Sequence, residues 1–247
     1  MIDFHCHILP GIDDGSPDME TSIEMARISI ASGVTHIVAT PHGSSSGLTD
    51  TLRRRDEAMQ ALSSRLEQEG LSLKLIPGLE YYADGHSADI NLVPLPARCG
   101  MPPYERRPIL VELPMSIDVS FAENLLFNAQ LVGMTVVLAH PSRYNGFKKH
   151  ADMFKRLLER GMYLQFNAVN IEGGFLFSGV ARTIIDIIAT DPDRVLLGSD
   201  AHEAKYRTTD MLCARKRVVA SLGEDVWHKI TTLNPAQLLG IDMEEMQ

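Results

Sequence analysis

Short apolar runs alternate along the chain with segments whose apolar residues recur at helical spacing. The runs predict seven strands, at residues 2–6, 35–39, 73–77, 109–113, 135–139, 163–166 and 195–197. The segments between them predict helices at residues 19–31, 49–68, 121–131, 152–159, 176–189 and 209–222. Several of these segments end in glycine, which tolerates the left-handed conformation that often closes a helix.

The order of these elements indicates the fold. A strand followed by a helix, repeated along the chain, favours a parallel sheet. Seven or eight such units close most economically into an α/β barrel of the TIM type, with an open doubly wound sheet as the alternative. The proline-rich stretch at residues 86–108 is unsuited to a helix or a central strand, so we expect a surface excursion there. We expect residues 1–247 to form one domain.

Composition narrows the class of protein. The net charge of −9 and the lack of a basic stripe argue against nucleic-acid binding, which requires neutralisation of phosphates. The chain shows neither a signal-peptide pattern nor an apolar run long enough to insert in a membrane. Its three cysteines lack metal-type spacing and fit a reducing compartment, so we expect a cytoplasmic protein. Its oligomeric state is not readable from the sequence.

Potential metal ligands lie at the ends of the predicted strands. His5 and His7 stand two residues apart, so they project from one face of a strand while Cys6 points to the other. Five other predicted strands contain or lead into His42, Glu80, Glu112, His140, and the pair Asp200 and His202. Catalytic groups of α/β barrels gather at the carboxyl ends of the strands, so we expect these side chains to meet.

The chemistry of this set indicates more than one ion. Imidazole nitrogen and carboxylate oxygen suit zinc, iron and manganese, whereas a cysteine-rich structural zinc site needs thiolates that are not aligned here. The ligands outnumber what one tetrahedral ion can use, so we predict two or three ions that share carboxylates. Glu80 is placed by its order in the chain to bridge two of them.

Several stretches together resemble the polymerase and histidinol phosphatase (PHP) superfamily, and more narrowly its bacterial protein-tyrosine-phosphatase branch associated with capsule and exopolysaccharide synthesis. The matching stretches are MIDFHCHILPGIDDGSPD, GVTHIVATPH, GLEYY, LVELPM, VVLAHPSRY, GSDAH and NPAQLLG, which span nearly the whole chain. The resemblance implies a distorted (β/α)7 TIM-like barrel, the PHP fold, with three divalent ions, manganese first and iron or zinc as alternatives.

The resemblance also implies which residues hold each ion. One ion would be held by His5, His7, Glu80 and Asp200. A second would be held by Glu80, Glu112 and His140. A third would be held by His42, His202 and one aspartate of the Asp13–Asp14 pair, of which we favour Asp14 and leave Asp13 open.

The resemblance further implies that Arg143 and Arg207 bind the substrate phosphate. A guanidinium can donate two parallel hydrogen bonds to phosphate oxygens, which suits this role. In the implied mechanism a metal-activated hydroxide attacks phosphorus without a covalent phosphoenzyme. The implied substrate is the phosphotyrosine tail of a bacterial tyrosine autokinase that regulates polysaccharide synthesis.

Other functions compete with this interpretation. Cysteine-based phosphatases carry an arginine six residues after the nucleophile, and none of the three cysteines has one. After His42 the chain reads GSSSGLTD where many relatives resemble it with a longer basic loop, so a phosphatase of small metabolites such as histidinol phosphate is the second candidate. We interpret the serines as a flexible linker rather than a substrate contact. A catalytically silent kinase-binding module and an amidohydrolase-like enzyme remain further alternatives.

Overall fold

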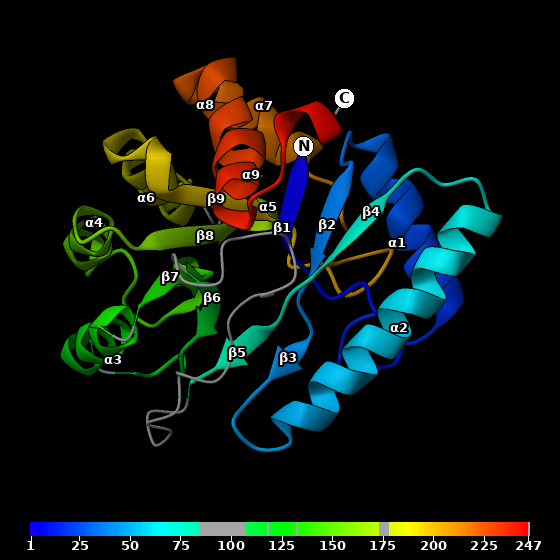
Figure 1. The fold of residues 1–247 in the computed structure, drawn as a ribbon. Coiled ribbons are helices and arrows are strands. Elements are labelled where there is room, and N and C mark those ends of the chain that lie inside the picture. Colours follow the sequence, from blue (N-terminus) through cyan, green and yellow to red (C-terminus); the bar gives the residue numbers. More distant parts are fainter. Residues whose placement is uncertain (84–106, 118, 132, 173–177, 247) are drawn as a thin grey trace.

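The structure is a computed structural model and describes residues 1–83, 107–117, 119–131, 133–172 and 178–246. All of its paired strands run parallel, which confirms the predicted parallel α/β class. One sheet has the order β1-β2-β4, and the other has the order β3-β5-β6-β7-β8-β9 (Figure 1). The strands are β1 Ile2–Cys6, β2 His36–Ala39, β3 His42–Gly43, β4 Lys74–Pro77, β5 Glu80–Tyr82, β6 Arg107–Glu112, β7 Met134–Ala139, β8 Tyr163–Asn167 and β9 Val195–Gly198.

The two sheets are linked where β2 gives way to β3 and β4 gives way to β5. Pro41 lacks an amide hydrogen and Gly78 has no side chain, so each interrupts a strand for a few residues. Backbone hydrogen bonds nevertheless continue across the break, from Gly78 N to Ala39 O at 2.9 Å and from Glu80 N to Pro41 O at 3.0 Å. The paired strands therefore stay together across the interruption.

Strands β1 and β9 approach each other at their carboxyl ends. The amide of Asp200 donates to His5 O at 2.7 Å, and the amide of His7 donates to Ala201 O at 2.9 Å. Gly198 permits this approach, because a Cβ at that position would lie 2.6 Å from the Cβ of His5. The first and last strands of the chain therefore lie next to each other at their carboxyl ends.

The predicted helices are observed with small shifts at their ends. The helices are α1 Met19–Ala31, α2 Leu48–Gln68, α3 Val119–Leu131, α4 Ala151–Glu159, α5 Ala168–Glu172, α6 Ser178–Thr190, α7 Leu212–Leu222, α8 Glu224–His228 and α9 Asn234–Leu239. The predicted start of α7 at Thr209 was wrong. There the Thr209 hydroxyl donates to Met25 O, and Asp210 accepts from the Leu212 amide, so the helix begins later.

Three short helices, α5, α8 and α9, were not predicted, because five or six residues are too few to show a helical period. The predicted excursion at residues 86–108 was wrong at its end, since Arg107 and Pro108 belong to β6. Proline is tolerated there because it stands near the start of the strand. The rest of that stretch, and residues 176 and 177 of the predicted helix at 176–189, lie outside the described residues.

Helices cover the outer faces of both sheets (Figure 1). The larger apolar cluster joins β6, β7 and β8 to helices α3, α4, α6 and α7, and a second joins β1 and β2 to α1 and α2. Within β8 the residues Leu164 and Phe166 are buried in the larger cluster. The alternate residues of the same strand, Gln165 and Asn167, face the polar centre of the molecule, as strand geometry requires.

Candidate metal centre

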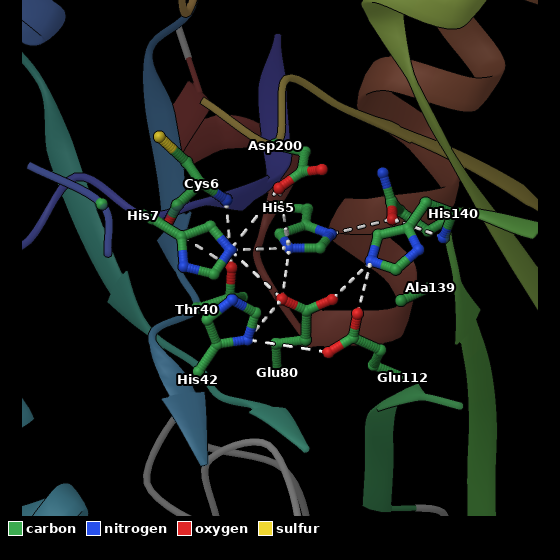
Figure 2. Close-up of polar contacts among 12 residues, drawn as sticks. His5, Cys6, His7, Thr40, His42, Glu80, Glu112, Ala139, His140 and Asp200 are labelled. Atoms are coloured by element: carbon green, nitrogen blue, oxygen red, sulfur yellow. Dashed lines mark hydrogen bonds and ion pairs between the residues drawn. The ribbon is translucent and has the colours of Figure 1, made fainter. Parts of the chain in front are cut away.

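The carboxyl ends of the strands bring together all nine residues predicted as metal ligands, of which all but Asp14 and His202 are labelled in Figure 2. They come from β1 and the loop after it, β3, β5, β6, the turn after β7 and the segment after β9. These residues form four overlapping groups whose ligand atoms lie within 4.8 Å of one another. The groups are His7, Asp14, His42 and His202; His5, His7 and Asp200; His5, Glu80 and His140; and His42, Glu80 and Glu112.

Glu80 lies at the centre of the cluster (Figure 2). Its Oε2 is 3.1 Å from His5 Nε2, 3.2 Å from His7 Nε2 and 3.1 Å from His42 Nδ1. Its Oε1 is 2.6 Å from His140 Nε2. The Glu80 carboxylate is fully buried, yet Oε2 makes no well-directed hydrogen bond. A buried anionic oxygen that is ringed by nitrogens and still lacks a donor fits the chemistry of a bridging metal ligand.

Asp13 and Asp14 make different contacts. Asp14 is exposed, and its Oδ1 lies 3.3 Å from His42 Nε2 and 3.6 Å from His202 Nε2. Both carboxylate oxygens of Asp13 already accept hydrogen bonds, because Oδ2 accepts from His7 Nδ1 at 2.8 Å and from the His42 amide, and Oδ1 accepts from the Gly15 amide. Asp13 therefore orients His7 from behind, and Asp14 is the aspartate that faces the other ligands.

The charges of His7 and Asp13 are strongly coupled. Burial disfavours the charged imidazole, but the hydrogen bond to Asp13 and the negative charge of Glu80 outweigh that effect and raise the pKa of His7 to about 10. Burial likewise opposes ionisation of Asp13, and the hydrogen bond from His7 lowers its pKa to about 2. In both shifts the contact between the His7 ring and the Asp13 carboxylate favours the charged forms of the pair.

The two predicted phosphate-binding arginines lie on one edge of the cluster. Arg143 Nη1 is 3.3 Å from Asp200 Oδ2, and Arg207 Nη2 is 3.0 Å from Asp200 Oδ1. Both guanidinium groups are only partly exposed, and both contact the same carboxylate. Two guanidinium groups that converge on one carboxylate offer donors to an anion bound beside it.

Cys6 takes no part in this arrangement. It is fully buried in the apolar cluster with α1, and Figure 2 shows its sulfur on the far side from His5 and His7. Burial raises the pKa of the Cys6 thiol well above its ordinary value. Because the nucleophile of a thiol phosphatase is a thiolate, this cysteine is unsuited to that role.

Sequence reasoning missed two further polar residues of the site, Gln165 and Asn167. They lie on β8, the strand for which no candidate ligand was named, and they contact His5 and Asp200 respectively. Their signal in the sequence is a pair of amides two residues apart inside the apolar run YLQFN. That spacing indicates one buried polar face.

Comparison with known proteins assigns the chain to a family. The profile of the family described as "Capsular polysaccharide synthesis, CpsB/CapC" matches residues 1–240. The chain belongs to the CpsB/CapC family. This membership confirms the resemblance found in the sequence to the capsule-associated branch.

Relatives in the CpsB/CapC family are named as phosphatases. Tyrosine-protein phosphatase YwqE of Bacillus subtilis (strain 168) is 32% identical over 208 residues, which cover 84% of this chain and 79% of that protein. The putative tyrosine-protein phosphatase CapC of Staphylococcus aureus is 25% identical over 207 residues, again 84% of this chain and 79% of that protein.

Solved structures agree with this relationship. Work on YwqE and on CpsB of Streptococcus pneumoniae describes them as metal-dependent tyrosine phosphatases, and the matching structure has a TM-score of 0.80 at 28% identity, covering 98% of this chain and 96% of that one. Histidinol phosphate phosphatase of Lactococcus lactis matches with a TM-score of 0.54 at 14% identity, over 90% of this chain and 93% of that one, which is a likeness of fold alone. No helix among the described residues has both the length and the apolar character needed to cross a membrane.

Proposed function

We propose that this CpsB/CapC-family chain is a metal-dependent protein-tyrosine phosphatase. The observation that carries the proposal is a buried cluster of histidines and carboxylates with two arginines on its edge and the nearby thiol excluded from it. Relatives named tyrosine-protein phosphatases support the choice of phosphotyrosine. The chemistry is hydrolysis of a phosphate monoester.

We infer that the centre holds three divalent ions, with manganese as the first candidate and iron or zinc as alternatives. The support is the overlap of the four ligand groups, in which Glu80, His5, His7 and His42 each occur twice. The proposed assignments remain those of the resemblance, with Asp14 completing the third set. When bound, such ions supply a Lewis acid and lower the pKa of coordinated water towards neutrality.

The residues of the chain have separate tasks in this proposal. The carboxylates and imidazoles hold and neutralise the ions, and Asp13 keeps His7 in one orientation. Arg143 and Arg207 donate to the phosphate oxygens and stabilise charge that develops on them during in-line displacement. The leaving phenoxide of tyrosine needs less assistance than a serine alkoxide, because the parent phenol has a pKa of about 10.

The fold we propose for this site is a single distorted (β/α)7 barrel. Its support is the approach of β1 to β9 on one side and the continued hydrogen bonds across the β2–β3 and β4–β5 breaks on the other. If each split pair counts as one strand, seven strand positions remain, as the sequence predicted. In such a barrel the carboxyl ends of all strands face one opening.

An open groove beside the cluster offers room for the substrate. Its volume is about 440 Å³, and its walls bring His42 and Glu112 together with Ser44, Ser46 and Tyr82.

 The volume of this groove is within the range of small-ligand sites. Tyr82 stands two residues after Glu80 on β5 and is in register with Glu112, so its ring faces the same side as the cluster.

The proposed physiological substrate is the phosphotyrosine tail of a tyrosine autokinase. The support is the family description, which concerns capsular polysaccharide synthesis, together with relatives named as tyrosine phosphatases. A disordered tail can present one phosphotyrosine at a time to an open groove. Ser44 and Ser46, in the segment interpreted from the sequence as a flexible linker, line that groove, where their hydroxyl groups could contact the peptide.

The deciding experiment compares substrates with the metal-loaded protein. We expect Mn²⁺-loaded enzyme to hydrolyse a phosphotyrosine peptide with a higher kcat/KM than histidinol phosphate or another small alkyl monoester, and to lose activity on chelation. A preference for the small monoester would replace the proposal with the metabolite phosphatase. Release of phosphate from neither substrate would favour the silent kinase-binding module.

A further inference from the structure

Two buried amides on β8, Gln165 and Asn167, form a hydrogen-bonded link beneath the metal centre. Gln165 is fully buried and Asn167 is 3% exposed. A buried amide is costly unless its donors and acceptor find partners. The amide groups of both residues are engaged in hydrogen bonds with neighbouring residues, which points to a supporting role beside the four ligand groups.

The link runs from His5 and His140 to Asp200. Gln165 Oε1 accepts from the His140 amide at 3.2 Å and lies 2.9 Å from His5 Nδ1. Gln165 Nε2 donates to Asn167 Oδ1 at 3.0 Å, and Asn167 Nδ2 donates to Asp200 Oδ2 at 2.6 Å. The pair therefore connects three of the proposed ligands through four contacts.

The direction of every hydrogen bond in this link follows from its two ends. The backbone amide of His140 can only donate, so the atom of Gln165 that faces it is the oxygen. Gln165 must then turn its NH₂ group to Asn167, whose NH₂ group in turn faces Asp200. An ionised carboxylate can only accept, so the far end agrees with the near end.

This direction determines which nitrogen of His5 carries hydrogen. Because Gln165 Oε1 accepts only, His5 presents an N–H at Nδ1, and the neutral ring keeps its lone pair at Nε2. His5 Nε2 is the atom that lies 3.1 Å from Glu80 Oε2. On Asp200, Asn167 engages Oδ2, while Oδ1 lies 3.5 Å from His7 Nε2.

The same link contacts two strained residues. Among the described residues, only His140 and Asp200 combine a side chain with a positive φ, of 30° and 53°. Such backbone conformations persist only where the surroundings hold them. Gln165 holds the His140 amide and Asn167 holds the Asp200 carboxylate.

We propose that Gln165 and Asn167 are positioning residues that make Nε2 of His5 the metal-binding nitrogen and orient Asp200 toward the same ion. The inference rests on the proposed function, because it presumes a metal centre. Removing partners of this kind from a metal ligand typically weakens metal binding 10- to 100-fold.

The test measures Mn²⁺ affinity from the electron paramagnetic resonance signal of free Mn²⁺. We expect Gln165→Met and Asn167→Leu each to weaken binding about 10- to 100-fold. The matched control is Asn234→Leu, which removes a buried amide that donates to Pro192 O and Val195 O outside the site. A variant that binds Mn²⁺ no more weakly than this control overturns the inference.

A second measurement needs no variant. In the zinc-loaded wild-type protein, long-range ¹H–¹⁵N correlation spectra should show His5 with hydrogen on Nδ1 and metal on Nε2. Metal on Nδ1 overturns the inference even if the variants fail to fold. If the wild-type protein binds neither Mn²⁺ nor Zn²⁺, the proposed metal centre is overturned and this inference with it. If the wild type binds metal and the two variants bind it equally well, this inference alone is overturned.

Discussion

Replacing Glu80 by glutamine should remove more than one ion from the centre. The substitution keeps the shape of the side chain but replaces an anionic oxygen with an NH₂ group. Glu80 is fully buried and belongs to two of the four ligand groups, one with His5 and His140 and the other with His42 and Glu112. We therefore expect the two ions that share Glu80 in the proposed assignment to bind more weakly at once, while the ion assigned to His42, His202 and Asp14 is retained.

The magnitude follows from burial and the number of contacts. Removing one charged partner from a buried, paired arrangement costs about 3–5 kcal/mol. At about 1.4 kcal/mol for each factor of ten, that cost corresponds to a loss of about 10²- to 4 × 10³-fold in affinity. The Glu80 carboxylate is within 3.2 Å of four imidazole nitrogens. A neighbouring carboxylate could take its place only if these histidine rings moved.

The assay is elemental analysis of Mn²⁺ bound at saturation, together with a competitive chelator titration. Glu123→Gln is the matched control, because Glu123 pairs with Arg156 at 2.8 Å on the surface. This control should bind Mn²⁺ as the wild type does. If Glu80→Gln retained the full number of ions with affinity within about threefold of the wild type, the bridging role of Glu80 would be wrong.

Four further predictions concern other residues. Arg207→Ala should lower kcat/KM for a phosphotyrosine peptide about 10²- to 10³-fold with metal content unchanged, and an unchanged rate would contradict phosphate binding by this arginine. Cys6→Ser should keep the phosphatase rate within a few-fold, since the buried thiol is outside the site; a complete loss in folded, metal-loaded protein would point to a thiol mechanism. Tyr82→Ala should raise KM for aryl phosphates more than for alkyl phosphates, and the exposed Phe127→Ala on α3 is its control; equal effects on both substrates would exclude a ring contact. Burial, together with the positive charges of Lys74 and the N-terminus, lowers the pKa of His36 from 6.5 to about 4. Between these two pH values the unfolded state binds more protons than the folded state, so the free energy of unfolding falls by at most about 3 kcal/mol as the pH drops through this window. His36→Gln should flatten this part of the stability profile in denaturant titrations, and an unaltered profile would assign the pH dependence to other groups.

The order of elements and most of the ligands were accessible from the sequence because both depend on local periodicity. Six of the seven predicted strands contain or lead into a histidine or a carboxylate, and parallel strands bring such ends to one edge. The pair His5 and His7 is readable for the same reason, since residues two apart share one face of a strand. The start of α7 was misjudged because the side-chain bonds of Thr209 and Asp210, rather than helical period, determine it.

Only the tertiary structure distinguished Asp13 from Asp14, because adjacent carboxylates look alike until their partners are known. The sequence also gave no reason to connect Gln165 with His5, which lies 160 residues earlier. Strand periodicity states which face a side chain occupies, but the direction of a hydrogen bond depends on which donor or acceptor stands opposite. The opposing donors and acceptors become known only when distant strands are packed together. Here they indicate which nitrogen of His5 carries hydrogen.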